Sequence, residues 1–321
     1  MDSDPSPLIQ FQNINKQFIL QKKTLSALQN INLSISKGKT LGLVGESGCG
    51  KSTLGKIALQ LENPTSGSVY FNGTPVSSLR KYPSELRRQM QMIFQDPYTA
   101  LNPRITIQNS IGEGLDIHRL AKGSERQEKI LELLNDVGLD SEMLHRYPHE
   151  LSGGQRQRVG IARALAVDPT VVVCDEPLSA LDAYTQQQIM QLLMNLKQTK
   201  RLTYLFISHD LQAIRQLSDH VAVMYLGRIV EYAPTNRLFT MASHPYTQAL
   251  LSAAPIADPI KERQRLRLVL KGEPPSPLCP PSGCPFHPRC PKATYECSKS
   301  LPPLKEVALE HLSACHYDSK S

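Results

Sequence analysis

The stretch Leu41-Gly42-Leu43-Val44-Gly45-Glu46-Ser47-Gly48-Cys49-Gly50-Lys51-Ser52 joins an apolar run to a glycine-rich loop. Leu41–Val44 is short and apolar, which predicts a buried strand. Gly45–Ser52 has the spacing GxxxxGK[ST] of a phosphate-binding loop, and Lys51–Gln60 predicts the helix after it. Glycines let the backbone turn tightly enough for its N–H groups to point at phosphate oxygens, and the helix N-terminus adds partial positive charge. A strand, a phosphate loop and a helix in this order predict a nucleotide site.

Further strands are predicted on both sides of the loop. Val69-Tyr70-Phe71 followed by Asn72-Gly73 indicates a strand and a turn. Val171–Cys174 and Tyr204–Ser208 are apolar runs that are each followed by a helical pattern. Near the N-terminus, apolar positions recur as in a half-buried sheet, at Ile9, Phe11, Leu28, Ile31, Leu33 and Ile35. Strands that alternate with helices indicate an α/β fold with a parallel core sheet.

The polar region from about residue 78 to 165 interrupts this alternation. It contains a helical stretch in which Ile130, Leu131, Leu134 and Val137 share one face, and Gly138 ends the pattern. We therefore expect a helical subdomain in this region.

Side chains of the loop and of a later strand supply the chemistry of the nucleotide site. Lys51 offers a cation to the β- and γ-phosphates, Ser52 offers its hydroxyl to Mg²⁺, and Thr53 supports that contact. Asp175 follows an apolar strand and is a hard oxygen ligand suited to Mg²⁺. Glu176 is then placed to orient or deprotonate the attacking water.

A second anion site is predicted at the signature segment Leu151-Ser152-Gly153-Gly154-Gln155. Ser152, Gly153 and Gly154 offer a hydroxyl and backbone N–H groups at a helix N-terminus. With the phosphate loop and Asp175-Glu176, this segment makes the chain resemble the nucleotide-binding subunits of ATP-binding-cassette (ABC) transporters over roughly residues 8–250. The resemblance implies an ATP-hydrolysing enzyme that uses ATP and Mg²⁺. It also implies that ATP is sandwiched between two subunits, with the signature segment completing the opposing subunit's site.

The same resemblance gives roles to residues elsewhere in the chain. Phe18 matches the position that stacks on adenine, where tyrosine is more usual, and Gln95 matches a glutamine that senses Mg²⁺ and water. Asp182 lies in the loop that crosses between subunits, and His209 matches the switch histidine that contacts the γ-phosphate. The implied catalytic residues are Glu176, His209 and Gln95. The implied Mg²⁺ ligands are Ser52, Gln95 and Asp175. The implied nucleotide-binding residues are Phe18, Gly45, Glu46, Ser47, Gly48, Cys49, Gly50, Lys51, Ser52, Thr53, Gln95, Ser152, Gly153, Gly154, Gln155, Asp175 and Asp182.

The implied fold is a P-loop NTPase domain of the ABC type, with a parallel core sheet, an antiparallel β subdomain and a helical subdomain. A Pro/Cys-rich C-terminal extension follows it. Ten prolines lie between Pro274 and Pro303, and five of the seven cysteines lie in the last 43 residues. Prolines exclude continuous helices and central strands there. The sequence therefore predicts a nucleotide-binding domain over residues 1–255 and an extension over residues 256–321.

The cysteines of the extension suggest a metal centre. Cys284, Cys290, Cys297 and Cys315 are separated by five, six and seventeen residues, without the CxxC pairs usual for zinc. Spacing alone leaves zinc and a 4Fe–4S cluster nearly balanced. The segments His244-Pro245-Tyr246-Thr247 and Gly283–Cys290 resemble the C-terminal extension of oligopeptide and dipeptide importer ATPases. That resemblance implies a 4Fe–4S cluster on these four cysteines and leaves Cys279 outside the set.

Composition limits the location and the partners. The chain has 321 residues and a net charge of +7, without an apolar run of membrane-spanning length or the features of a secretory signal. A basic run interleaved with aromatic residues would predict nucleic-acid binding, and this chain has none, so we expect no nucleic-acid partner. We therefore expect the chain in the cytosol, and the resemblance implies a peripheral place on the cytoplasmic face of the cell inner membrane. The resemblance implies as partners two membrane-spanning permease subunits, a second and paralogous ATPase subunit, and indirectly an extracytoplasmic solute-binding protein.

The resemblance implies that the chain is the ATP-hydrolysing subunit that energises a bacterial importer of di- or oligopeptides. Three other functions are compatible with parts of the sequence. A close variant is the same ATPase role in uptake of nickel or another small solute, because other subunits choose the substrate. A soluble ABC ATPase acting on nucleic acid or ribosomes is expected to have two cassettes or a long coiled-coil insertion, and this chain has neither. A redox-sensing module with vestigial ATPase activity rests on the cysteines alone.

Overall fold

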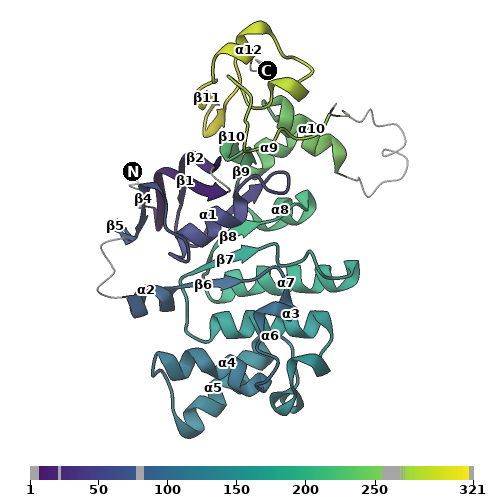
Figure 1. Ribbon diagram of the computed structural model, residues 1–321. Coiled ribbons are helices and arrows are strands. Elements are labelled where there is room, and N and C mark those ends of the chain that lie inside the picture. Colours follow the sequence, from purple (N-terminus) through teal and green to yellow (C-terminus); the bar gives the residue numbers. More distant parts are fainter. Residues whose placement is uncertain are drawn as a thin grey trace. The chain divides into compact units, whose positions relative to one another are not determined.

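The structure is a computed structural model that describes residues 7–20, 23–76, 83–254, 268, 270 and 272–317. They divide into two compact units, and Figure 1 labels the helices and strands. Among the described residues, unit 1 contains residues 7–8, 35–39, 71–76 and 83–207, and unit 2 contains residues 9–20, 23–34, 40–70, 208–254, 268, 270 and 272–317. The predicted boundary between residues 255 and 256 and the predicted subdomain start near residue 78 lie outside the described residues, so the division into domains stays a prediction.

Unit 1 has a parallel sheet of three strands, β6 (Met90–Ile93), β7 (Val171–Asp175) and β8 (Thr203–Ile207). All residues of β7 and β8 are buried, as expected for parallel strands that are covered on both faces. Helix α7 (Ala183–Thr199) is tied to β8 by a 3.1 Å hydrogen bond from the Tyr204 hydroxyl to the carbonyl of Leu193. The predicted strands Val171–Cys174 and Tyr204–Ser208 are confirmed to within one residue at each end.

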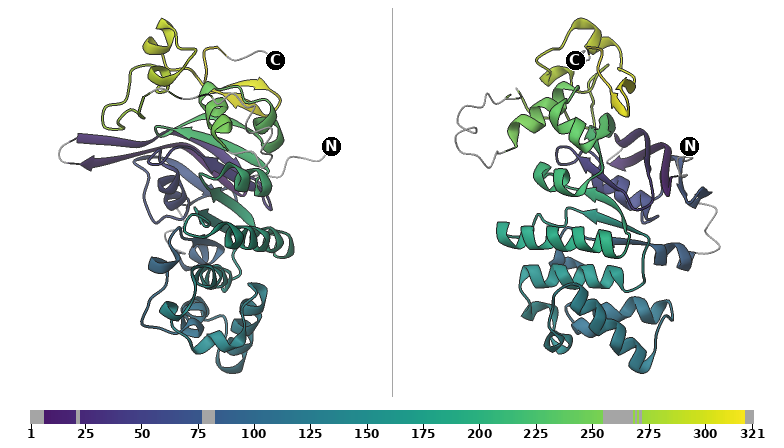
Figure 2. Two further views of the ribbon diagram at one scale, coloured as in Figure 1. Left: turned by 90° about the vertical axis from the view of Figure 1, so that its right-hand side faces the viewer. Right: turned by 180° about the vertical axis from the view of Figure 1, so that it is seen from behind.

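The expected helical region of unit 1 contains seven helices in the described part of residues 78–165 (Figures 1 and 2). They are α2 (Pro83–Gln89), α3 (Pro97–Ala100), α4 (Ile107–Ile117), α5 (Gly123–Asp136), η2 (Ser141–His145), η3 (Pro148–Glu150) and α6 (Gly153–Leu165). On α5 the buried face holds Ile130, Leu133 and Leu134, whereas Leu131 is 38% exposed, so its predicted place on that face was wrong. Val137 is buried, and Gly138 has a left-handed φ of 67° where the helical pattern ends.

One sheet of unit 2 holds the N-terminal strands β1 (Ile9–Leu20), β2 (Lys23–Ile35) and β4 (Ser66–Phe71), in the order β2-β1-β4. All six apolar positions that predicted this sheet are buried. The turn predicted after Phe71 is present, with positive φ at Asn72 and Gly73. The two-residue strand β5 (Thr74–Pro75) belongs to unit 1.

A second sheet of unit 2 positions the phosphate loop. β3 (Thr40–Val44) pairs in parallel with β9 (His220–Tyr225), which pairs antiparallel with β10 (Arg228–Pro234). The helices of this unit before residue 255 are α1 (Lys51–Ala58), α8 (Leu211–Leu217), α9 (Thr235–Thr240) and α10 (Pro245–Ala253). α8 packs closely on β3. A Cβ added to Gly42 on β3 would lie only 3.1 Å from the Ile214 side chain on α8, so the absence of a side chain at Gly42 allows this close approach.

The C-terminal extension continues this second sheet. β12 (His311–Ser313) pairs antiparallel with β10, and β11 (Lys305–Ala308) pairs antiparallel with β12 (Figures 1 and 2). The proline-rich part before them forms only η4 (His287–Arg289) and the five-residue helix α12 (Tyr295–Lys299). No helix in the described ranges has the length and apolarity that a membrane span requires.

Candidate active site

Three glycines with positive φ shape the phosphate loop, which follows β3. The φ angles are 153° at Gly45, 76° at Gly48 and 107° at Gly50. A Cβ on Gly45 would lie 2.2 Å from the carbonyl oxygen of Met224, so no larger residue fits this turn. Gly50 is the N-cap of α1, so the helix begins directly at the end of the loop. The backbone conformation needed to surround a phosphate is thus built into the chain.

Lys51 is directed back at the loop from the first position of α1. Its side chain is 5% exposed, and Nζ donates hydrogen bonds to the carbonyls of Gly45 at 2.8 Å and Glu46 at 3.0 Å. These acceptors compensate part of the cost of burying an ammonium group. Burial raises the pKa of the neighbouring Cys49 thiol, although Lys51 acts in the opposite direction. Cys49 is therefore a neutral packing residue of the loop rather than a nucleophile.

The carboxylates of unit 1 lie at the end of β7. Asp175 is its last residue and is 6% exposed. Glu176 has a left-handed φ of 46°, and its N–H donates to the carbonyl of Ile207 at 2.9 Å. Left-handed backbone costs a non-glycine residue about 1–2 kcal/mol. Nε2 of Gln95 donates to the Glu176 carboxylate at 3.1 Å, so the structure brings these two predicted residues together.

The signature segment leads into α6. Ser152 is the N-cap: its hydroxyl accepts from the Gln155 N–H at 3.2 Å, while the Gln155 side chain accepts from the Ser152 N–H at 2.9 Å. This capping box fixes the start of the helix. A Cβ on Gly154 would lie 2.5 Å from the Thr185 methyl group, so the first turn of α6 lies tightly against the start of α7.

Asp182, His209 and Phe18 lie outside the phosphate loop and the signature segment. Asp182 caps α7 by accepting from the Thr185 N–H at 3.0 Å and from its hydroxyl at 2.7 Å, and these bonds lower the pKa of Asp182. His209 precedes Asp210, which caps α8. Phe18 lies half-buried on β1, with Nζ of Lys16 4.8 Å from its ring centroid.

The candidate residues fall into both units. The phosphate loop, Ser52, Thr53, Phe18 and His209 belong to unit 2. Gln95, the signature segment, Asp175, Glu176 and Asp182 belong to unit 1. Ser52 in unit 2 carries a hydroxyl oxygen, and Gln95 and Asp175 in unit 1 carry amide and carboxylate oxygens, which are ligand types that Mg²⁺ prefers.

The cysteines of the extension correct the prediction of an iron–sulfur cluster. Cys284, Cys290, Cys297 and Cys315 do line one small cavity, and Cys279 is exposed. Nevertheless, no group of three or more His, Cys, Asp or Glu side chains in the described part of the chain is arranged to hold a metal ion. Burial raises the pKa of the Cys284 thiol to about 11, and the neighbouring cysteines act in the same direction. The 4Fe–4S prediction is therefore wrong.

Packing replaces the cross-link that a cluster would have supplied. Phe286 is 1% exposed, and its ring lies 5.3 Å from that of Tyr225 and 5.4 Å from that of Tyr246. An apolar anchor and the two added strands β12 and β11 therefore contribute to the order of the extension.

Two residues that contact the phosphate loop were missed by sequence reasoning. The Tyr246 hydroxyl accepts from the Glu46 N–H, and Arg289 forms an ion pair with the Glu46 carboxylate. More than 200 residues separate Arg289 from Glu46 in the chain, and neither residue belongs to a spacing pattern that points to a phosphate.

Comparison with known proteins places these residues in context. The ABC transporter family matches residues 28–179, and the family described as oligopeptide/dipeptide transporter, C-terminal region, matches residues 230–297. A Bacillus subtilis protein named putative oligopeptide transport ATP-binding protein YkfD is 48% identical over 97% of this chain and 95% of its own length. The B. subtilis oligopeptide transport ATP-binding protein AppF is 46% identical over 96% of this chain and 97% of its own length. The dimeric structure of MJ0796, titled a bacterial ABC transporter cassette, superposes with a TM-score of 0.65 at 31% identity over 71% of this chain and 98% of its own.

Proposed function

This chain belongs to the ABC transporter family, among the ATP-binding proteins with an oligopeptide/dipeptide C-terminal region, and on that premise we propose that it powers peptide uptake across a membrane. Members of this family are ATPases, and hydrolysis of ATP is the activity of this chain. Two relatives of nearly the same length are named for oligopeptide transport, which supports peptides as the solute.

The observation that carries hydrolysis is the 3.1 Å hydrogen bond from Gln95 to Glu176 beside the buried Asp175. In our proposal Glu176 is the general base: its carboxylate accepts a proton from the attacking water. In our proposal the Gln95 amide fixes the orientation of that carboxylate through its hydrogen bond and also contacts the water. Asp175, Gln95 and Ser52 would hold Mg²⁺, which supplies charge neutralisation at the phosphates when it is bound.

The phosphate loop is the proposed binding element for ATP. Backbone N–H groups of Gly45–Ser52 and the N-terminus of α1 would face the phosphate oxygens. The ammonium group of Lys51 is already directed at the loop and would exchange carbonyl partners for the β- and γ-phosphates. We assign Thr53 to support of Ser52, Phe18 to the adenine ring and His209 to the γ-phosphate.

The signature segment is proposed to serve a second cassette. The capping box fixes Ser152 and Gln155 at the start of α6, where the helix N-terminus attracts anions. In our proposal Ser152, Gly153, Gly154 and Gln155 complete the ATP site of the opposing cassette, and Asp182 lies in the loop between the two. Closure over ATP and separation after hydrolysis would then form a two-state cycle. The dimeric MJ0796 cassette supports such pairing.

The proposed partners follow from this role. A second, paralogous ATPase would pair with this chain, and both would bind two membrane-spanning permease subunits on the cytoplasmic face of the inner membrane. An extracytoplasmic solute-binding protein would deliver the peptide to the permeases.

Uptake measurements in cells that lack this chain test the proposal. Uptake of a labelled tripeptide should be lost, restored by the wild-type chain and not restored by Glu176→Gln. Normal peptide uptake together with loss of nickel uptake would replace peptide by nickel as the solute. Full restoration by Glu176→Gln would contradict the assigned general base.

A further inference from the structure

Residues beyond the nucleotide-binding motifs fix the second residue of the phosphate loop. The N–H of Glu46 donates to the Tyr246 hydroxyl at 2.9 Å, and its carboxylate oxygens each accept from Nη1 of Arg289 at 2.9 Å. The carbonyl of Glu46 accepts from Nζ of Lys51 at 3.0 Å. One residue therefore connects α10 and the C-terminal extension to the lysine that is proposed to bind phosphate.

Arg289 is well placed to fix the Glu46 side chain. It ends η4, its side chain is only 8% exposed, and Nη1 also lies 3.4 Å from the Tyr225 hydroxyl. Burial opposes the positive charge, but hydrogen bonds to Tyr225 and Glu46 outweigh it and raise the pKa of Arg289. The guanidinium is therefore charged at neutral pH.

An aromatic cluster fixes the positions of Arg289 and Tyr246. Tyr225, Tyr246 and Phe286 are each at most 1% exposed, and their ring centroids lie 4.6–5.4 Å apart. Phe286 lies three residues before Arg289, so burial of its ring places η4 against the end of β9. Aromatic pairs at these distances prefer defined mutual orientations. The Tyr246 hydroxyl and the guanidinium therefore have little freedom to move.

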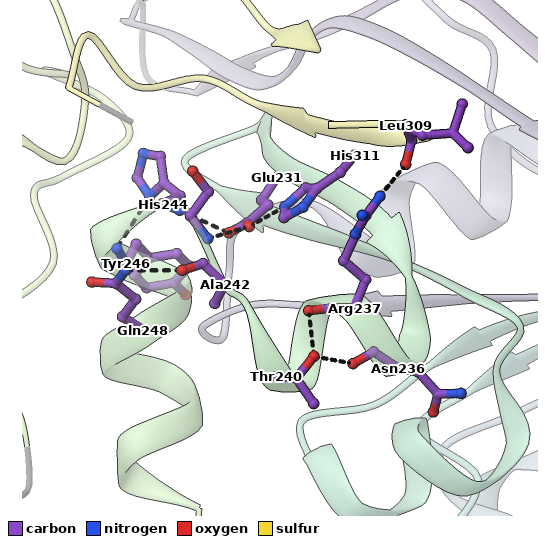
Figure 3. Close-up of polar contacts among 11 residues, drawn as sticks. Glu231, Asn236, Arg237, Thr240, Ala242, His244, Tyr246, Gln248, Leu309 and His311 are labelled. Atoms are coloured by element: carbon purple, nitrogen blue, oxygen red, sulfur yellow. Dashed lines mark hydrogen bonds and ion pairs between the residues drawn. The ribbon is translucent and has the colours of Figure 1, made fainter. Parts of the chain in front are cut away.

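A buried carboxylate fixes the start of α10, which carries Tyr246. Glu231 is wholly buried and accepts from the N–H groups of Ser243 at 2.6 Å and His244 at 3.0 Å (Figure 3). His311, on β12 of the extension, lies with Nε2 2.7 Å from the same carboxylate. Nδ1 of His244 accepts from the Tyr246 N–H at 3.1 Å. The extension thus contributes Arg289 directly, and through the contact of His311 with Glu231 it also helps to fix the start of the helix that carries Tyr246.

The ion pair is a poor source of stability, which favours a role in positioning. Nε of Arg289 is buried and has no hydrogen-bond partner in the described structure. A buried ion pair with an unsatisfied donor recovers little of its desolvation cost. What the pair does supply is a fixed orientation of Glu46 within a loop whose conformation decides phosphate binding.

We propose that Arg289 and Tyr246 are positioning residues for the phosphate loop, so that the C-terminal extension sets the affinity of this cassette for ATP. The inference rests on the proposed function of the loop as the ATP site. With both contacts in place, the loop is preorganised, and ATP binding does not have to order it.

Direct measurement of ATP affinity tests the inference. Isothermal titration with ATP and Mg²⁺ on the purified full chain should give a Kd about tenfold higher for Arg289→Ala, equivalent to about 1.4 kcal/mol. Arg289→Lys should recover most of the affinity, because Nη1 alone makes both contacts with the carboxylate. Tyr246→Phe, which keeps the buried ring and removes the hydroxyl, should raise the Kd about threefold.

A double-mutant cycle separates positioning from general destabilisation. Glu46→Gln and Arg289→Ala should each weaken ATP binding. Because both substitutions remove the same Glu46–Arg289 contact, the Kd of the double variant should be about that of the single variant with the higher Kd. Additive effects of the two changes would contradict the pair as the source of the affinity. A lowered Tm with an unchanged Kd in both Arg289→Ala and Tyr246→Phe would assign these residues a structural role and overturn the inference.

Arg237→Ala is the matched control. Arg237 also joins the extension to the rest of unit 2, through a 2.6 Å hydrogen bond to the carbonyl of Leu309 (Figure 3). Among the described residues, the contact of its guanidinium is with Leu309 and not with the phosphate loop. Its ATP affinity should equal that of the wild type, and a Kd raised as much as in Arg289→Ala would contradict the proposal. Lys51→Ala tests the premise: if it binds ATP like the wild type, the proposed function of the loop fails, and the inference fails with it.

Discussion

The phosphate loop and the cysteine-containing extension are both short segments rich in residues with special backbone properties, yet they are ordered by different means. In the loop, three glycines with positive φ and the N-terminus of α1 form the site from the backbone itself. In the extension, proline excludes regular structure over much of the segment, and order comes from Phe286, from β12 on β10 and from the contact of His311 with Glu231. A site made of backbone is encoded locally, whereas a site made of side chains depends on where distant segments meet.

The largest expected effect separates binding by the loop from the chemistry at the end of β7. Glu176→Gln should lower the rate of ATP hydrolysis by about 10²–10⁴-fold, because an amide cannot accept the proton from water. The Kd for ATP should stay that of the wild type, since the phosphate loop is unchanged. Phosphate release and nucleotide titration on the same sample measure the two quantities.

Glu132→Gln is the control for this variant, because Glu132 is exposed on α5. It should hydrolyse ATP at the wild-type rate. A loss of ATP binding in Glu176→Gln would mean that the loop does not bind nucleotide on its own.

Removal of the aromatic anchor tests whether packing orders the extension. Phe286→Ala should destabilise unit 2 by about 3–5 kcal/mol, the usual cost of truncating a fully buried phenylalanine. Residues after about 270 should become sensitive to protease, and chemical denaturation measures the loss of stability. Leu278→Ala is the control, since Leu278 is 40% exposed in the same segment and should change stability by less than about 0.5 kcal/mol.

An added methyl group tests the loop in the opposite way. Gly45→Ala should destabilise the protein by about 2–3 kcal/mol and weaken ATP binding at least about tenfold, because the new Cβ would collide with the carbonyl of Met224. Gly38→Ala isolates the cost of backbone strain: its φ is 74°, but no atom lies within 4 Å of the added Cβ. It should cost only about 1–2 kcal/mol and leave the Kd unchanged. Equal effects on ATP binding would show that the collision at Gly45 does not matter.

The smallest effect is expected at the cysteines. Cys290→Ser keeps the size of a half-buried side chain and should change stability by less than about 1 kcal/mol, as should Cys279→Ser at an exposed position. Thermal unfolding of both variants measures this. A loss at Cys290 as large as that of Phe286→Ala would mean that the four cysteines hold the extension through a bridge that packing does not supply.

Much of the fold was predictable because its determinants are local. The apolar run before Gly45, the alternation from Ile9 to Ile35 and the apolar strand before Asp175 all predicted the observed strands. The prediction for Leu131 was wrong because helical periodicity defines a wider face of α5 than the part that packs against neighbouring elements. Leu131 lies outside that packed part, and Leu133 is buried instead. The ends of the helical region and of the nucleotide-binding domain have no sharp signal in the sequence.

By itself the sequence determined the family, the phosphate loop and the residues around it, because glycine spacing, helix N-termini and strand ends act over a few residues. Tertiary structure alone decided that Gln95 reaches Glu176, that the four cysteines share a cavity without forming a metal site, and that Tyr246 and Arg289 fix Glu46. These contacts join residues as far as 243 positions apart. Their geometry is set by the burial of Phe286, Tyr225 and Glu231 in the folded chain, which no local pattern of residues specifies.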